Sequence, residues 1–275
     1  MPNELFMILF GLVVGFYGTL AGIGGGFLIV PFLMNLYGFS HTLAVGTSLA
    51  VIFANSLSGS ASYLYQKRVD LEAGIKFALA TIPGVFIGVK INHQIDTGFF
   101  RIIFGVFLLL IAGLILFKKT ALMNAKTVNA SERIAGRWPR AYRKFIDRHG
   151  VEFEYEYNEL HGIILSFFVG IIASLFGIGG GIMHVPAMIF IFSFPAHIAT
   201  ATSHFILCVT ALTSAILYGT GNSIDWGMAL WMAGGAIVGA QIGGTVSRRF
   251  RGIFILRLIS VLLVFLAIQM IFKFF

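Results

Sequence analysis

The chain has 275 residues, of which 58% are hydrophobic and only 11% are charged, with a formal net charge of +8. A soluble domain carries about 25% charged residues, so the composition excludes an ordinary water-soluble protein. The positive charge requires no nucleic-acid partner, because membrane proteins gather Lys and Arg in their cytoplasmic loops. The single cysteine, Cys208, excludes an internal disulfide and a CxxC metal or redox pair.

Eight hydrophobic segments follow one another along the chain, and a helix that crosses the bilayer needs about 20 apolar residues. We place them at residues 5–38, 41–65, 73–90, 99–117, 161–193, 196–218, 227–246 and 253–274. The pattern predicts an all-α polytopic membrane protein in contact with the lipid bilayer.

One long polar stretch, residues 118–158, separates the fourth segment from the fifth and contains nine Lys and Arg residues. It ends in the alternating run 151–157, which predicts a short strand with one acidic face. We interpret 118–158 as a charged cytoplasmic linker between membrane repeat 1 (1–117) and membrane repeat 2 (159–275). The alternative is a regulatory or partner-docking element.

The two halves of the chain are copies of one unit. With a shift of 155 residues, the two halves align over some 80 positions without a gap, and many of the aligned pairs are identical. The matched pairs include Gly22/Gly177, Gly24/Gly179, Gly25/Gly180, Gly26/Gly181, Pro31/Pro186, Thr47/Thr202, Ser48/Ser203, Tyr63/Tyr218 and Asp70/Asp225.

The first segment of each copy is too long for one simple crossing. A continuous helix over residues 5–38 would span about 51 Å, against about 30 Å of hydrocarbon. The Gly-Ile-Gly-Gly-Gly cluster falls near its middle, and glycine both disfavours helix and accepts positive φ. We therefore predict a half-helix, a glycine turn and a second half-helix, with Pro31 and Pro186 in the opening turns of the second halves. The alternative role for the glycines is close helix packing.

The Lys and Arg residues favour inverted repeats. If each broken segment returns to the side from which it came, Lys67, Arg68, the linker charges and the cluster at 248–251 all lie on one side. The positive-inside rule makes that side cytoplasmic and places both termini outside.

Broken helices in inverted repeats build transport sites near the bilayer midplane. The N-terminus of each second half-helix offers unpaired N–H groups and the positive end of a helix dipole, which together suit an anion. The predicted binding residues from the two repeats are Gly24, Gly25, Gly26, Thr47, Ser48, Gly179, Gly180, Gly181, Thr202 and Ser203. The alternative for the four hydroxyls is hydrogen bonding within their own helices.

Two histidines in the second copy replace aliphatic residues of the first: His184 aligns with Ile29, and His204 aligns with Leu49. An ionisable residue within the membrane is a functional candidate, so we add both to the binding residues. The alternative is a packed, neutral histidine.

All eleven Asp and Glu residues lie in loops, termini or segment ends. Their placement disfavours a cation pump that uses buried acids, and it favours an anionic substrate. We predict no catalytic residue, no metal site and no cofactor.

The duplicated GIGGG-x₄-P motif, followed by Gly-Thr-Ser at 46–48 and Ala-Thr-Ser at 201–203, resembles the TauE/SafE sulfite exporter family. The resemblance covers both halves of the chain. It implies a multi-pass secondary transporter in the bacterial plasma membrane that exports sulfite, sulfonates or related sulfur-containing anions.

Two other classes of function compete with a transporter. An anion channel, or a permease for another small anion, could use the same glycine-lined path. A membrane-embedded enzyme would need acid–base pairs or metal ligands, and no such cluster is found in the sequence. The oligomeric state, including a homo-oligomer, is left open.

Overall fold

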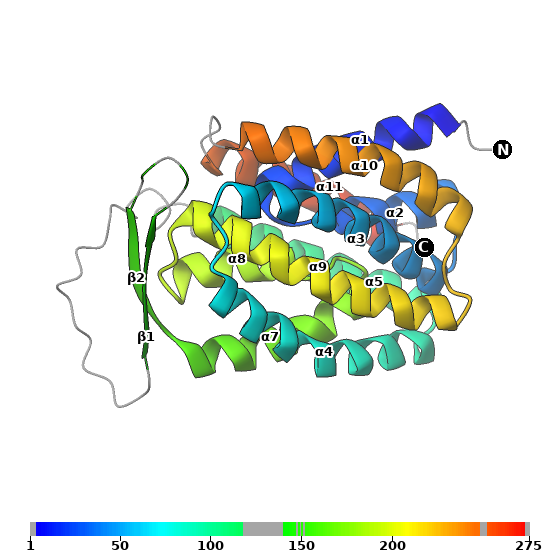
Figure 1. Cartoon of the computed structure of the whole chain (residues 1–275). Coiled ribbons are helices and arrows are strands. Elements are labelled where there is room, and N and C mark those ends of the chain that lie inside the picture. The colour runs from blue at the N-terminus through cyan, green and yellow to red at the C-terminus, as the bar shows by residue number, and fades with distance from the viewer. Residues whose placement is uncertain are drawn as a thin grey trace.

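The computed structural model describes residues 4–117, 140–146, 148, 150, 152–247 and 252–272. The first half contains α1 (Glu4–Ala21), α2 (Gly26–Leu36), α3 (His41–Tyr65), α4 (Leu71–Gln94) and α5 (Thr97–Phe117) (Figure 1). The second half contains α7 (Glu159–Phe176), α8 (Gly181–Phe190), α9 (Ala196–Thr220), α10 (Trp226–Val246) and α11 (Gly252–Phe272). Between the halves lie strands β1 (Arg140–Ile146) and β2 (Glu152–Asn158).

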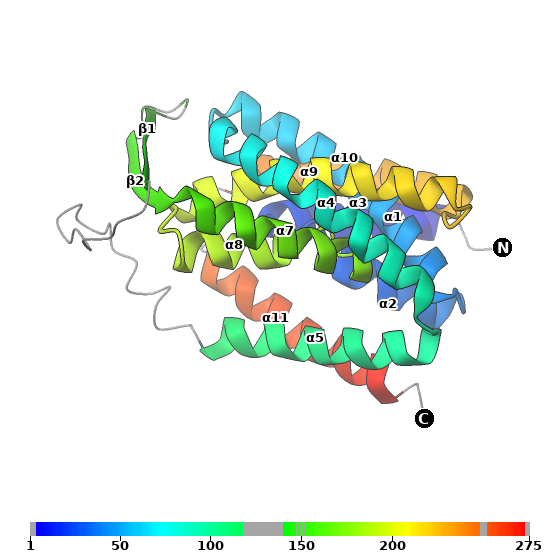
Figure 2. The same ribbon diagram turned by 90° about the horizontal axis from the view of Figure 1, so that it is seen from below.

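The helices form one bundle with their long axes in a common direction (Figure 2). Strands β1 and β2 lie at one end of the bundle, whereas α1 begins and α11 ends toward the other (Figures 1 and 2). Seven of the described helices are long and apolar enough to cross a membrane. Large apolar side chains such as Leu110, Leu230 and Phe265 are exposed on the bundle, as a lipid-facing surface requires. The prediction of an all-α polytopic membrane protein is confirmed.

The first segment of each half is broken at its glycine cluster, as predicted. Residues 22–25 separate α1 from α2, and residues 177–180 separate α7 from α8. The backbone has positive φ at Gly22, Gly24 and Gly25 and again at Gly177, Gly179 and Gly180, between 70° and 91°. Other L-residues rarely adopt this conformation, so the turns require glycine at these positions.

The predicted place of the two prolines is wrong. Helix α2 begins at Gly26 and α8 at Gly181, so Pro31 and Pro186 lie inside the helices, beyond the opening turn. Proline has no N–H, and each one therefore leaves a carbonyl of the first helical turn without its usual partner. Membrane helices tolerate this loss where neighbouring protein groups surround the helix.

The two halves interlock through helix pairs that each take one member from either half: α1 with α10, α7 with α4, α3 with α9, and α5 with α11. Glycine allows the backbones to touch, as where Gly15 faces the backbone of Ala236 and Gly88 faces that of Ile171. Small residues at such contacts take the place of the hydrophobic effect, which is absent between helices in lipid.

Helices α3 and α9, which correspond under the 155-residue shift, run antiparallel. Asp70 follows the end of α3, and its backbone N–H donates to Thr202 Oγ1 near the start of α9, at 3.0 Å. The reciprocal bond joins the N–H of Asp225, after the end of α9, to Thr47 Oγ1 near the start of α3, also at 3.0 Å. The described halves therefore contact each other in a two-fold manner.

The second part of the charged linker folds into a β-hairpin, in which β1 pairs antiparallel with β2. The predicted strand at 151–157 is found as β2, and its acidic face, Glu152, Glu154 and Glu156, is exposed. Strand β1 was not foreseen, because its sequence, RAYRKFI, alternates less regularly. Residues 118–139, 147, 149 and 151 of the linker lie outside the described residues.

The α1–α10 contact generates a prediction with a built-in control. A Cβ at Gly235 would overlap the backbone of Ile8, whereas a Cβ at the adjacent Gly234 meets nothing within 4 Å. Gly235→Leu should therefore lower the free energy of unfolding in detergent by about 1–3 kcal/mol, the usual effect of overpacking. Gly234→Leu should leave thermal stability unchanged or slightly raised. Equal stability of the two variants would contradict the packing described.

Candidate functional site

The two glycine turns meet at the centre of the bundle. A Cβ on Gly26 would collide with the carbonyl of Gly177, and a Cβ on Gly181 would collide with that of Gly22. All residues of 22–26 and 177–181 are buried. The structure thus brings the N-termini of α2 and α8 together, from halves that are far apart in sequence.

Both turns contact the same pair of aliphatic side chains. A side chain at Gly24 or at Gly179 would meet Ile52 of α3 and Leu207 of α9. These two residues correspond under the 155-residue shift, so they lie where the two halves of the structure meet. The centre of the bundle is consequently formed by the backbone of the two glycine turns and by the apolar side chains of Ile52 and Leu207.

Neither half-helix has a side-chain cap. The N-cap residues are Gly25 and Gly180, both in the left-handed conformation, and neither can supply a side-chain acceptor. The first N–H groups of a helix have no acceptor within it, so they need another partner. Each terminus also carries the positive end of a helix dipole, which attracts an anion by about 0.3–1 kcal/mol, or up to about 2 when partly buried.

Each of the predicted hydroxyls forms a hydrogen bond between the two halves, and those of Ser48 and Ser203 reach the glycine turns. Ser48 Oγ donates to the carbonyl of Gly177 at 2.9 Å, and Ser203 Oγ donates to that of Gly22 at 3.3 Å. Thr47 and Thr202 accept the two aspartate N–H groups already described. All four side chains are fully buried. Ser48 and Ser203 thus donate across the halves rather than within their own helices. The role of the four hydroxyls toward an anion stays a prediction.

His204 belongs to a buried hydrogen-bonded chain that reaches the first glycine turn. Its Nε2 lies 3.3 Å from Thr19 Oγ1, which donates to Asn55 Oδ1 at 2.9 Å. Asn55 Nδ2 in turn donates to the carbonyl of Gly24 at 3.1 Å. Because Thr19 donates to Asn55, the Nε2 of His204 is the donor to Thr19. Nδ1 of His204 is then a buried acceptor without a hydrogen-bond partner among the described residues.

His184 lies at the second turn and in a separate network. It occupies the first turn of α8, its backbone N–H donates to the carbonyl of Gly180, and its Nε2 lies 3.1 Å from Ser166 Oγ of α7. His184 thus adjoins the second glycine turn directly, whereas His204 is linked to the first through Thr19 and Asn55.

Three residues that build the site, Thr19, Tyr63 and Tyr218, were not among the predicted binding residues. Thr19 links His204 to Asn55, and it also accepts, through its carbonyl, the hydroxyl of Tyr63 at 2.8 Å. Tyr218 makes the corresponding bond to the carbonyl of Ser174 at 3.0 Å. The alignment of Tyr63 with Tyr218 in the two copies was the sequence signal that could have identified this pair of tyrosines. Over the described ranges, no group of three His, Cys, Asp or Glu could hold a metal ion.

The whole chain can be compared with known proteins. The family model for the sulfite exporter TauE/SafE matches residues 7–273. The probable membrane transporter protein YunE of Bacillus subtilis is 32% identical over 274 residues, which cover 97% of each chain. MJ0441 of Methanocaldococcus jannaschii, also a probable membrane transporter protein, is 31% identical over 79% of this chain and 73% of its own.

A third relative, the probable membrane transporter protein YjnA of Bacillus subtilis, is 30% identical over 89% of this chain and 90% of its own. No solved structure shows a significant match. The family match spans both repeats and the hairpin between them. The chain is a multi-pass membrane transporter protein and belongs to the TauE/SafE sulfite exporter family.

Proposed function

We propose that this protein is a secondary transporter that exports small sulfur-containing anions, such as sulfite or organosulfonates, across the bacterial plasma membrane. The observation that carries the proposal is the meeting of the α2 and α8 N-termini, both without a side-chain cap, at the buried centre of the bundle. The family description supports a sulfur oxyanion and the direction of export.

The charges around the half-helices support an anion. The guanidinium of Arg101 donates to Asn35 Oδ1 at 2.9 Å and to the carbonyl of Met34 at 3.4 Å, at the C-terminal end of α2. A cation there matches the negative end of the helix dipole and leaves the N-terminal end for a negative ligand. Two opposed N-termini could hold sulfite or a sulfonate group by backbone N–H donors, without a buried Lys or Arg.

The antiparallel course of α3 and α9 supports inverted repeats that work by alternating access. In this arrangement the chain crosses the membrane three times in each repeat, both termini lie outside, and the linker 118–158 is cytoplasmic. The Asp70–Thr202 contact forms the hairpin-side gate, and the Asp225–Thr47 contact forms the far-side gate. Because both contacts are made in the structure, we interpret both gates as closed and the state as occluded.

Opening of a gate would change the role of the hydroxyls. Ser48 and Ser203 now donate to glycine carbonyls of the opposite repeat. If the repeats move apart at one end, these hydroxyls become free to donate to the anion instead. The residues of both glycine turns are buried, which favours a carrier over an open channel.

The proposed topology can be tested at two equivalent positions. Lys67 and Asn222 correspond under the shift, both are exposed, and both have φ near +50°. In a Cys208→Ser background, an impermeant maleimide should label Lys67→Cys from the cytoplasmic side only. It should label Asn222→Cys from the outside only. Labelling of both positions from the same side would refute the inverted arrangement.

The proposed site can be tested by the smallest added side chain. Gly24→Ala and Gly179→Ala introduce a Cβ at positive φ that collides with Leu207, so both should remove sulfite counterflow from reconstituted vesicles. Gly38→Ala is the control, because Gly38 also has positive φ but has open space around it. That variant should keep its flux.

Binding is measured on the same three variants. Sulfite should raise the apparent melting temperature of the wild-type protein and of Gly38→Ala, since a ligand that binds only the folded state stabilises it. The shift should vanish in Gly24→Ala. Normal counterflow in both glycine-turn variants would contradict the site, and flux without counterflow or saturation would indicate a channel.

A further inference from the structure

The β-hairpin does not extend freely into solvent but covers one end of the bundle. Tyr155 and Tyr157 of β2 are 6% and 3% exposed. The ring of Tyr155 lies 4.4 Å from that of Phe194, between α8 and α9, and Tyr157 lies 4.9 Å from the same ring. Tyr157 also contacts Phe77 of α4 edge-on. The inner face of the hairpin thus forms one apolar cluster with three helix ends of the membrane domain.

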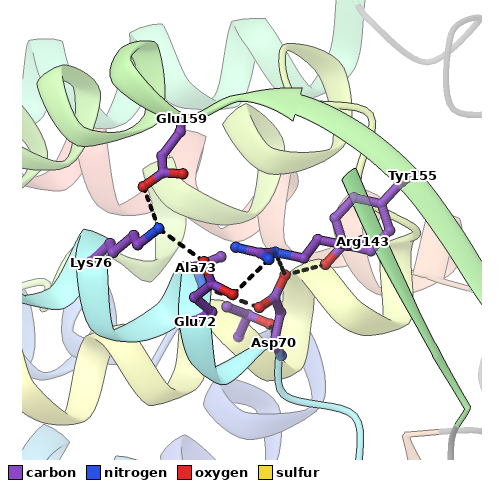
Figure 3. A network of polar contacts seen from close by, with 8 residues as sticks. Asp70, Glu72, Ala73, Lys76, Arg143, Tyr155 and Glu159 are labelled. Carbon is purple, nitrogen blue, oxygen red and sulfur yellow. Dashed lines mark hydrogen bonds and ion pairs between the residues drawn. The ribbon is translucent and has the colours of Figure 1, made fainter. Parts of the chain in front are cut away.

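Two side chains of the hairpin converge on Asp70, as Figure 3 shows. Tyr155 donates its hydroxyl to Asp70 Oδ2 at 2.6 Å, and Arg143 Nε lies 3.5 Å from the same oxygen. Arg143 also pairs with Glu72 at 2.6 Å. Burial, together with the charge of Asp70, raises the pKa of Tyr155 well above its ordinary value, so the phenol stays protonated and able to donate.

Asp70 transmits this contact to the gate. Its Oδ1 accepts the N–H of Ala73 and so caps α4, while its own N–H donates to Thr202. The next residue along α9, Ser203, bonds to the carbonyl of Gly22. A continuous series of hydrogen bonds and one peptide link therefore joins the hairpin to the first glycine turn.

The far-side gate provides an internal comparison. Asp225 caps α10 through Met228 at 2.9 Å and donates its N–H to Thr47, as Asp70 does at the other end. Asp225 is only partly buried, however, and among the described residues no Tyr or Arg side chain contacts its carboxylate. The two gates therefore have the same backbone hydrogen bond between an aspartate and a threonine. They differ in the side-chain contacts that the hairpin makes with Asp70.

We propose that the β1–β2 hairpin is a one-sided clamp that holds the hairpin-side gate closed through Tyr155, Arg143 and Asp70. The proposal rests on the alternating-access function proposed above. Two repeats of equal design would open toward either side with similar ease. The clamp makes the two openings unequal, because only the hairpin-side opening must break the contacts with Asp70 and part the aromatic cluster.

The hairpin supplies matched controls on its opposite face. Tyr142 and Lys144 are exposed there, and Lys144 pairs with Glu152 rather than with the membrane domain. Tyr155→Phe combined with Arg143→Gln removes the clamp contacts. Tyr142→Phe combined with Lys144→Gln makes the same chemical changes away from the gate. Tyr155→Phe alone removes only one oxygen atom and serves if the double variant fails to fold.

Amide hydrogen exchange of the full-length protein in detergent tests the clamp without any substrate. In the Tyr155/Arg143 variant, the amides of 70–74 should exchange about tenfold faster, as expected when a charge-assisted bond that holds the segment is lost. The amides of 225–229 should not change, and the Tyr142/Lys144 variant should match the wild type at both segments. Unchanged exchange at 70–74 would overturn the clamp, and so would an equal increase at both segments.

Transport provides a measurement that would not change if the hairpin only stabilised the fold. A closed gate lowers apparent affinity on its own side by the fraction of molecules that are open there. Loss of the clamp should therefore lower, by up to about tenfold, the sulfite concentration that half-saturates flux from the hairpin side. An equal half-saturating sulfite concentration in the Tyr155/Arg143 variant and in the Tyr142/Lys144 control would overturn the clamp. Absence of sulfite transport in the wild-type protein would instead overturn the proposed function. Amide hydrogen exchange would still test the clamp in that case.

Discussion

The contact between the two glycine turns is the constraint on which the rest of the structure depends. Positive φ at Gly24, Gly25 and their counterparts stops two helices inside the bundle and starts two others there. Backbone groups at that depth must find partners in the protein or in a ligand, since lipid offers none. Carbonyls of the turns are met by Ser48 and Ser203 of the opposite repeats, whereas the first N–H groups of α2 and α8 have no side-chain cap. An anion would complete the centre.

Much of this could be predicted from the sequence, because segment length and glycine are local signals. An overlong apolar run with a GIGGG cluster predicted the breaks at 22–25 and 177–180, and the 155-residue repeat predicted that they are equivalent. Proline misled the prediction: Pro31 lies deeper in its helix than a helix-opening proline does. The turns themselves, with glycine as the N-cap, already provide the geometry for starting the second half-helix.

What the sequence could not reveal are the partners across the repeats. The hydroxyls of Thr47 and Ser48 could be placed near a glycine turn, but not assigned to Asp225 and Gly177 of the other repeat, because such pairings depend on how the halves interlock. The same holds for the contact of Tyr155 with Asp70, 85 residues apart. The alignment of the copies already identifies His184 and His204 as differences, but their partners Ser166 and Thr19 are seen only in the structure.

The proposed site places an oxyanion where the N-termini of α2 and α8 meet. Selenite has the shape and charge of sulfite, and its selenium atom can be located by anomalous X-ray scattering from crystals of the full-length protein. We expect one anomalous peak within hydrogen-bonding distance of the backbone N–H groups at 25–27 and 180–182. A selenite peak elsewhere in the protein, with none between the two turns, would contradict it.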